Sequence, residues 1–201
     1  SNPPSYFYDQ DVCNGASVTL APTSSTPGTI FSWTSSVNGP VSGVTSSGTG
    51  NISDVLVNTG STAGVVTYTI TATANGCSGA SVISKRYVFP TPFVALNQSK
   101  TICSGVSVNY DIAVSPEGVE LNWPDPDGSG PATSAANRTW AVDIIDQLTN
   151  TGTSPLAVTY QVTPFYRMNN SAGCPGAATS VVINVNPKPV MTSAISGVGC
   201  N

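Results

Sequence analysis

Short segments in which hydrophobic and polar residues alternate run through the chain, and this two-residue period predicts β-strands with one buried face. In the clearest segment, 65–73, the apolar residues that alternate with threonines are Val66, Tyr68, Ile70 and Ala72. Other strands are predicted at 17–21, 29–34, 52–57, 81–89, 107–113, 119–123, 140–148, 157–163 and 179–186. Residues 35–51 are rich in Ser, Gly and Asn and are expected to form a loop. Since no segment has a convincing helical stripe, the pattern predicts an all-β protein.

These segments recur in the same order because the sequence contains an internal repeat. Pro90 lies thirteen positions after Cys77, and Pro187 lies thirteen positions after Cys174. The offset from Cys103 to Cys200, 97 residues, measures one full unit. This spacing predicts two domains and the start of a third, with boundaries at 1–92, 93–189 and 190–201.

Each predicted domain ends in a Pro-x-Pro joint, formed by Pro90 and Pro92 in the first copy and by Pro187 and Pro189 in the second. Proline fixes φ and restricts the residue before it to extended conformations. The joints are therefore expected to be short, stiff linkers between domains strung end to end.

The order of the predicted strands indicates the architecture of each domain. An early strand carries a tryptophan, at Trp33 and Trp123, and a late strand carries a tyrosine, at Tyr68 and Tyr160. Many short strands separated by turns, with aromatic residues at these places, favour an immunoglobulin-like β-sandwich. The fold prediction is two such sandwiches in tandem.

The five cysteines fit the same repeat. Cys13 and Cys77 fall in the first domain and Cys103 and Cys174 in the second, which predicts one disulfide within each domain and an oxidising compartment. Cys200 takes the first-cysteine position of the third copy, so we expect it to be unpaired by truncation. A free reactive thiol at Cys200 is the alternative. Zinc is disfavoured because the sequence has no Cys-x-x-Cys pair and no histidine.

Composition excludes several classes of function. Charged residues make up 8% of the chain and the net charge is −4, so no basic patch for nucleic acid is expected. No run of about 18 apolar residues predicts a membrane span. A secretion signal is expected to lie outside this fragment, since no charged segment followed by an apolar core begins it.

Candidate chemistry is sparse. Asp125 and Asp127 have ligand-like spacing and form a weak calcium candidate, but the ligand set is incomplete and a plain Asp/Pro/Gly turn is favoured, so no metal or other cofactor is predicted. Three acidic pairs could serve a glycosidase, although nothing aligns them, and an enzyme is not expected. They are Asp9 with Asp11, Glu117 with Glu120, and Asp143 with Asp146.

Two aromatic runs are candidates for stacking against sugars or for packing at a domain junction. The first is Tyr6, Phe7 and Tyr8, and the second is Phe165, Tyr166 and Arg167, in the Phe165–Gly173 segment that lengthens the second copy and is expected to be a loop. The motif for N-glycosylation occurs at Asn51, Asn97, Asn137 and Asn169, which is weak support for glycosylation in a chain rich in Asn, Ser and Thr.

Taken together, several motifs resemble the PKD-like repeats of very large bacterial surface adhesins, including the SprB-type adhesins of gliding bacteria that the type IX secretion system exports. The motifs are Ile102-Cys103-Ser104-Gly105, Trp123, the Asn-Thr-Gly turns at 58–60 and 150–152, Asn75-Gly76-Cys77-Ser78-Gly79 and Val185-Asn186-Pro187. The resemblance covers nearly the whole chain. It implies PKD-like sandwiches in long tandem arrays.

The resemblance also implies a function, a location and partners. It implies a non-enzymatic segment of an extracellular, cell-surface filament that serves attachment and gliding motility. The expected partners are neighbouring repeats of the same chain, surface polysaccharide and the gliding or secretion machinery. A carbohydrate-binding module of a secreted multidomain protein is the alternative, and it predicts exposed coplanar aromatic side chains.

Overall fold

The computed structural model describes residues 10–116, 119–124, 138–141, 143–168 and 171–191, and all the regular structure in these ranges is β-strand. The chain divides into two compact units. Unit 1 consists of Ser1–Phe93, Val114–Val119 and Pro164–Ala177, and unit 2 of Val94–Ala113, Glu120–Thr163 and Ala178–Asn201. The predicted all-β class is confirmed.

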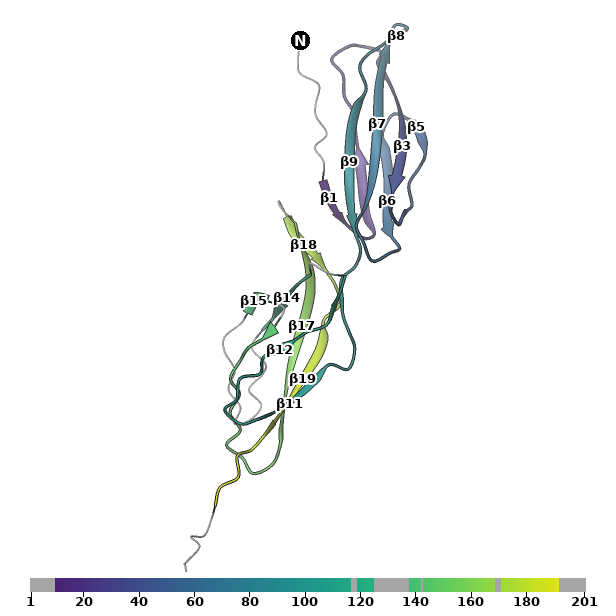
Figure 1. Ribbon diagram of the computed structural model, residues 1–201. Helices are drawn as coiled ribbons and strands as arrows, with labels where there is room; N and C mark the ends of the chain where they lie inside the picture. The colour runs from purple at the N-terminus through teal and green to yellow at the C-terminus, as the bar shows by residue number, and fades with distance from the viewer. Residues whose placement is uncertain (1–9, 117–118, 125–137, 142, 169–170, 192–201) are drawn as a thin grey trace, which may run out of the picture. The chain divides into compact units, whose positions relative to one another are not determined.

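Unit 1 contains a two-layer sandwich (Figure 1). One sheet has the order β1-β9-β7-β3-β5, with β8 also paired to β7, and the other has the order β2-β6-β4. The strands are β1 (Gln10–Cys13), β2 (Ala16–Leu20), β3 (Ile30–Asn38), β4 (Val41–Ser42), β5 (Ser47–Thr49), β6 (Ile52–Asn58), β7 (Gly64–Ala74), β8 (Cys77–Ser78) and β9 (Val82–Phe89). The segment 35–51 is thus not the predicted loop, because it contains the end of β3 and two short strands.

The second half of the chain repeats this order. One sheet has the order β11-β19-β17-β14-β15, with β18 also on β17; β12 pairs with β16, and β10 with β13. The strands are β10 (Phe93–Val94), β11 (Ser99–Cys103), β12 (Tyr110–Asp111), β13 (Val114–Ser115), β14 (Glu120–Trp123), β15 (Arg138–Ala141), β16 (Asp143–Ile144), β17 (Leu156–Met168), β18 (Ser171–Pro175) and β19 (Thr179–Asn186). The hairpin end of β17 and β18 belongs to unit 1, and β11, β12, β14, β15, β16 and β19 to unit 2.

The core of unit 1 lies between its two sheets. Trp33 packs edge-on against Tyr68, with ring centroids 6.3 Å apart. Gly48 faces Trp33 across the β3–β5 pair, and a Cβ added to Gly48 would overlap the indole ring. The remaining buried core residues, drawn from both sheets, are Val18, Leu20, Ile52, Leu56, Val66, Ile70 and Val88. The alternation seen in the sequence therefore marks the faces that fill this sandwich.

A buried tyrosine–aspartate pair occurs in both halves of the chain. The Tyr68 hydroxyl donates to Asp54 Oδ2 at 2.7 Å, and the Tyr160 hydroxyl donates to Asp146 Oδ2 at 3.0 Å. Thr45 also binds the Asp54 carboxylate, through its hydroxyl at 2.7 Å. Burial, and then the hydrogen bond and charge of Asp54, raise the pKa of Tyr68 far above its usual range, so the phenol stays protonated and donates.

The Asn-Thr-Gly turns are held by the same hydrogen bonds in both copies. Asn58 Nδ2 donates to the carbonyl of Val88 at 2.7 Å, and the Gly60 amide donates back to Asn58 Oδ1 at 2.9 Å. Asn150 Nδ2 donates to the carbonyl of Val185 at 2.8 Å in the same way. These side chains satisfy buried backbone groups, which is why the turn is a structural feature of each copy.

The first strand of each copy runs parallel to the last strand, and this direction decides where the cysteines lie. Cys13 ends β1 opposite Phe89, at the end of β9 where the chain leaves the copy. Cys77 lies opposite Ala74, at the other end of β7 from Gly64, which pairs with Val88. Figure 1 shows β8 and the end of β1 at opposite ends of the sandwich.

The predicted disulfide between Cys13 and Cys77 is therefore wrong. Strand β7 has 11 residues, which at ~3.3 Å per residue places about 33 Å between its ends. A disulfide needs Cα atoms within about 7 Å of each other. The structure bonds Cys13 to Cys174 instead and leaves Cys77 as an exposed thiol.

The predicted disulfide between Cys103 and Cys174 is wrong for the same reason. Cys103 ends β11 opposite Asn186, beside the start of β17, where Leu156 pairs with Val185. Cys174 pairs with Tyr166, near the far end of the 13-residue strand β17. Cys103 is an exposed free thiol. The expectation of one disulfide inside each domain is thus replaced by one disulfide that joins the two copies of the sequence.

Replacing Tyr68 by phenylalanine should lower the stability of unit 1. The change leaves the buried Asp54 carboxylate without one of its donors, which costs about 1–3 kcal/mol. Urea unfolding followed by fluorescence measures this, with Y87F, at a half-exposed tyrosine of the same unit, as the matched control. Equal midpoints for Y68F and Y87F would show that the Tyr68–Asp54 bond does not stabilise the sandwich.

The cysteines should differ in their reactivity in the folded, oxidised chain. Iodoacetamide should modify Cys77 and Cys103, because both thiols are exposed, and should leave Cys13 and Cys174 unmodified until they are reduced. Peptide mass spectrometry after a second alkylation with a distinguishable reagent measures this. Denaturing without reductant is the control, and it should leave Cys13 and Cys174 protected. A linked peptide containing Cys13 and Cys77 would contradict the assignment.

Candidate functional site

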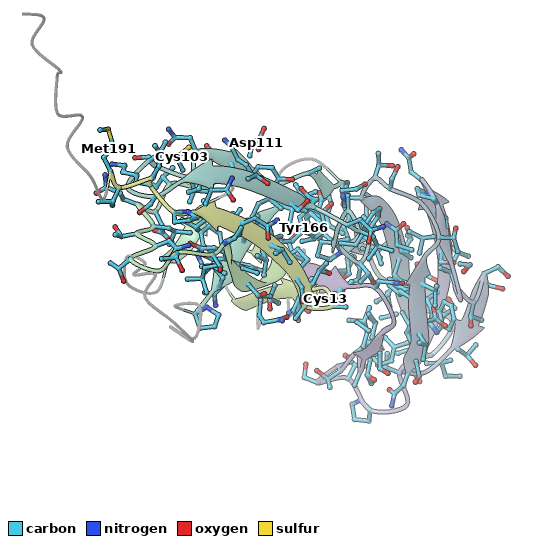
Figure 2. All side chains as sticks on the ribbon, turned by 90° about the horizontal axis from the view of Figure 1, so that it is seen from below. Cys13, Cys103, Asp111, Tyr166 and Met191 are labelled. Atoms are coloured by element: carbon cyan, nitrogen blue, oxygen red, sulfur yellow. A yellow bond between two sulfur atoms is a disulfide. The ribbon has the colours of Figure 1, made fainter. Side chains whose placement is uncertain are left out.

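The disulfide between Cys13 and Cys174 is the centre of the candidate site, and both residues belong to unit 1 (Figure 2). Their Cα atoms are 5.3 Å apart although 161 positions separate them in the sequence. Cys13 is half-buried at the end of β1, and Cys174 is 2% exposed in β18. The bond is therefore more enclosed on the side of Cys174 than on the side of Cys13.

An aromatic pair flanks the disulfide. Phe89 lies opposite Cys13 in the β1–β9 pair, and Tyr166 lies opposite Cys174 in the β17–β18 pair. Their ring centroids are 5.1 Å apart with the planes tilted by 46°. Tyr166 is 8% exposed, and burial raises the pKa of its hydroxyl. The two registers that bring the sulfurs together thus also bring these two rings together.

Two glycines of the β17–β18 hairpin allow close approach of backbone. A Cβ at Gly176 would overlap the carbonyl oxygen of Pro92, and a Cβ at Gly173 would overlap the carbonyl oxygen of Tyr166. The Gly176 amide donates to the carbonyl of Pro164 at 2.8 Å. A larger residue at Gly176 would therefore push the hairpin away from Pro92, and one at Gly173 would push β18 away from β17.

The first Pro-x-Pro joint is fixed within the same unit. Pro90 and Pro92 are buried, and Thr91 is exposed between them. Asn14 Nδ2 donates to Thr91 Oγ1 at 3.0 Å, while Asn14 Oδ1 accepts from the Asn58 amide at 2.8 Å. The residue after Cys13 therefore ties the joint to the Asn-Thr-Gly turn.

A cavity of about 510 Å³ lies beside the aromatic pair. Its lining residues are Ser61, Thr62, Ala63, Phe89, Ser115, Pro116 and Tyr166. Hydroxyl, aromatic and aliphatic groups make up this lining. Among the described residues that line it, none carries a carboxylate, an amine or a thiol.

Only some of the residues predicted as metal ligands or catalytic acids lie within the part of the chain that the structure describes. Asp125, Asp127, Asp9, Glu117 and Cys200 lie outside the described residues, as do Tyr6, Phe7 and Tyr8. Within the described ranges, no group of three or more Asp, Glu, Cys or His side chains could hold a metal ion. Asp146, one of the predicted acids, is 1% exposed and accepts the hydrogen bond from Tyr160. In the same ranges no helix is long and apolar enough to span a membrane.

The Phe165–Gly173 segment is not the predicted loop. Strand β17 continues to Met168 and β18 begins at Ser171, so the extra residues lengthen a hairpin. Of its aromatic residues, Tyr166 packs against Phe89, which matches the packing alternative and not an exposed platform for sugars.

Sequence reasoning missed Phe89, Asp54 and Gly176, although Asp54 and Gly176 each have a counterpart at the same spacing in the other copy. Asp54 and Tyr68 are 14 residues apart, as are Asp146 and Tyr160. Gly79 and Gly176 follow Cys77 and Cys174 at the same distance. Phe89 has no such signal, because Asn186 takes its place in the second copy.

Comparison with solved structures gives several matches of low sequence identity. The IG1+IG2 fragment of DIP-gamma is 9% identical with a TM-score of 0.43, covering 92% of this chain and 96% of its own. Mouse cadherin-23 EC22-24 is 15% identical with a TM-score of 0.37, covering 92% and 64%. The insect immune protein hemolin is 15% identical with a TM-score of 0.37, covering 92% and 46%. The comparison with curated proteins gives no match.

The family model gives the assignment. The model described as a PKD-like domain matches the chain twice, at residues 10–92 and 100–189, and so accounts for most of its length. The two matches contain the two copies of the cysteine, tyrosine–aspartate and Asn-Thr-Gly features described above. The chain belongs to the PKD-like domain family, of which it carries two copies.

Proposed function

We propose that this chain is a structural and adhesive repeat segment of a long extracellular, cell-surface adhesin filament that serves surface attachment and gliding motility. PKD-like and immunoglobulin-like repeats are typical of extracellular adhesion proteins and are structural domains. The motifs that resemble SprB-type adhesins support the more specific role in gliding and export by the type IX secretion system. Neighbouring repeats, surface polysaccharide and the gliding or secretion machinery are the partners that this role requires.

The observation that carries the proposal is the bond between Cys13 and Cys174. Cys13 lies in the first PKD-like match and Cys174 in the second. Two covalent connections therefore join the two copies, the backbone and the disulfide. A filament that attaches a moving cell to a surface is under tension, and the second covalent connection prevents extension of the chain between Cys13 and Cys174 when non-covalent contacts break.

The disulfide also supports an extracellular location. Structural disulfides persist in oxidising environments and are rare in the cytosol. A buried bond between β1 and β18 would be lost in a reducing compartment, together with the second connection.

Pulling the chain from its two ends should reveal the second connection. The separation of 161 residues corresponds to roughly 550 Å of extended chain at ~3.3–3.6 Å per residue. With the disulfide intact, this length should stay hidden, and only residues outside positions 13 and 174 should extend. Single-molecule force spectroscopy measures the released length.

Reduction with dithiothreitol should release the hidden length, and the double variant C13S/C174S should release it without reductant. The variant C77S is the matched control and should behave as the original chain, since Cys77 takes no part in this bond. Equal released lengths for the oxidised original chain and the double variant would remove the mechanical basis of the proposal.

Antibodies raised against the chain should label intact cells that produce it. The proposal places the repeats outside the cell, so labelling should need no permeabilisation and should fall after brief treatment of intact cells with a protease. Fluorescence microscopy or flow cytometry measures this, with an antibody to a cytoplasmic protein as the control. Labelling that appears only after permeabilisation would overturn the proposed location.

A further inference from the structure

The exposed Cys103 occupies the same structural position as the bonded Cys13. Cys13 ends a strand parallel to the last strand of its copy and lies opposite Phe89, and Cys103 ends the equivalent strand opposite Asn186. Phe89 and Asn186 each immediately precede the first proline of a joint. The two cysteines therefore have the same register relative to the point at which the chain leaves each copy.

The hydrogen bonds that follow these two cysteines are also the same. The Gly15 amide donates to the carbonyl of Leu56 at 2.8 Å, and the Gly105 amide donates to the carbonyl of Leu148 at 2.8 Å. Both glycines have φ near +77°. The Ser104 hydroxyl accepts from the Asn150 amide at 2.9 Å, as Asn14 Oδ1 accepts from the Asn58 amide. The backbone that presents Cys103 thus matches the backbone that presents Cys13.

The exposed Cys77 occupies the same position as the bonded Cys174. Each cysteine lies on the returning strand of a hairpin, Cys77 opposite Ala74 and Cys174 opposite Tyr166. Two residues later, the Gly79 amide donates to the carbonyl of Ala72 at 2.8 Å, and Gly176 donates to Pro164 at 2.8 Å. Cys77 is exposed, whereas Cys174 is 2% exposed.

The surface around the second joint is open where the first joint is covered. Pro90 and Pro92 are buried, but Pro187 is half-buried and Pro189 is exposed. Two residues beyond the joints, Val94 is 2% exposed and Met191 is 77% exposed. Cys103 is near this joint because it pairs with Asn186, the residue before Pro187, and Figure 2 shows Cys103 and Met191 toward the same end of the second copy. The apolar residues and the free thiol mark a surface that fits another repeat of the same kind.

We propose that Cys103 forms a disulfide with the hairpin cysteine of a PKD-like repeat that follows it in the same polypeptide, and that Cys77 forms one with the first cysteine of a repeat that precedes it. Each repeat is then bonded to the next as Cys13 is bonded to Cys174. The inference rests on the proposed function in one respect, because it requires an array of such repeats.

The chemistry is the oxidation of two thiols to one disulfide. An S–S bond forms, and two protons and two electrons leave the sulfurs. A dithiol–disulfide oxidant, such as oxidised glutathione or a thiol oxidoreductase of the export compartment, takes up both and is reduced. Exposure of Cys77 and Cys103 gives such an oxidant access to both thiols.

A lengthened chain tests the proposal. Residues 190–201, which include Cys200, are replaced by a second copy of residues 93–189, so that the added copy follows Pro187-Lys188-Pro189 as residue 93 follows Pro90-Thr91-Pro92. In the added copy, the substitution C103S removes the first cysteine. A second substitution there, A178S at an exposed residue, changes the mass of the hairpin peptide, so that the added copy's Cys174 can be told from the original Cys174. After folding in a glutathione redox buffer, the products are mapped by non-reducing peptide mass spectrometry.

The expected products are the original bond between Cys13 and Cys174 and a new bond between Cys103 and the hairpin cysteine of the added copy. Cys77 should be the single remaining thiol, so a thiol-reactive dye should label one cysteine per chain. C103S in the middle copy is the matched control, and it should raise the labelling to two per chain while Cys13–Cys174 persists. A Cys103 that stays reactive, or that bonds to Cys77 or Cys174, would overturn the proposal.

A second test uses the native polypeptide in place of the lengthened chain. The protein is purified, under alkylating conditions, from the cells that make it. Peptides containing Cys77 and Cys103 should each be linked to a cysteine peptide from outside residues 1–201. Finding both peptides alkylated as free thiols would refute the inference. The tests of the proposed function do not depend on this result. Cell labelling depends on the location of the chain at the cell surface, and the force measurement depends on the bond between Cys13 and Cys174. Free thiols at Cys77 and Cys103 would therefore refute this inference and leave the proposed function to be tested separately.

Discussion

The direction of the first strand in each copy is the constraint on which the rest of the structure depends. Because β1 runs parallel to β9, its final residue, Cys13, lies at the end of the sandwich where the chain leaves the copy. The hairpin cysteine of the same copy lies a full strand length away. A sulfur at the first position can therefore reach a hairpin cysteine only when that hairpin belongs to a different copy.

Hydrogen bonds of the asparagine turns hold the end of β1 in this position. Asn58 binds both its own turn and the carbonyl of Val88, one residue from the position opposite Cys13. Asn14 connects the same turn to Thr91 of the joint. The cysteine, the turn and the joint thus form one hydrogen-bonded group. Because Asn150 and Ser104 repeat most of this arrangement, the second copy presents its first cysteine in the same manner.

Features that depend on neighbouring residues could be predicted from the sequence, and those that depend on pairing between distant strands could not. The alternation at 65–73 correctly placed Tyr68 and Ile70 in the core, and the order of the short strands with their aromatic residues predicted the sandwich. Strand β1 was missed because Gln10–Cys13 has no clear alternation and forms only by pairing with β9. Because the direction of β1 is not visible in the sequence, the repeat spacing was as compatible with a disulfide inside each domain as with one between the two copies.

The same limit explains the errors in the second copy. Only a single bridge, from Ser107 to Gln147, and the two-residue strand β12 occupy the predicted strand at 107–113. The extra residues between Phe165 and Gly173 were read as a loop because their count differs between the copies. Their backbone pairs with itself as a longer hairpin, and pairing of this kind leaves no trace in residue spacing alone.

Loop entropy explains why a bond between copies stabilises the chain as well as one inside a copy. The stabilisation grows only with the logarithm of loop length, so closing 161 residues gives about 5 kcal/mol, against about 4 kcal/mol for the roughly 64 residues between Cys13 and Cys77. The choice of partner therefore changes stability little and changes connectivity a great deal. A bond inside a copy restrains that copy alone, whereas the bond from Cys13 to Cys174 prevents the chain between the two copies from being pulled out unless the disulfide is broken.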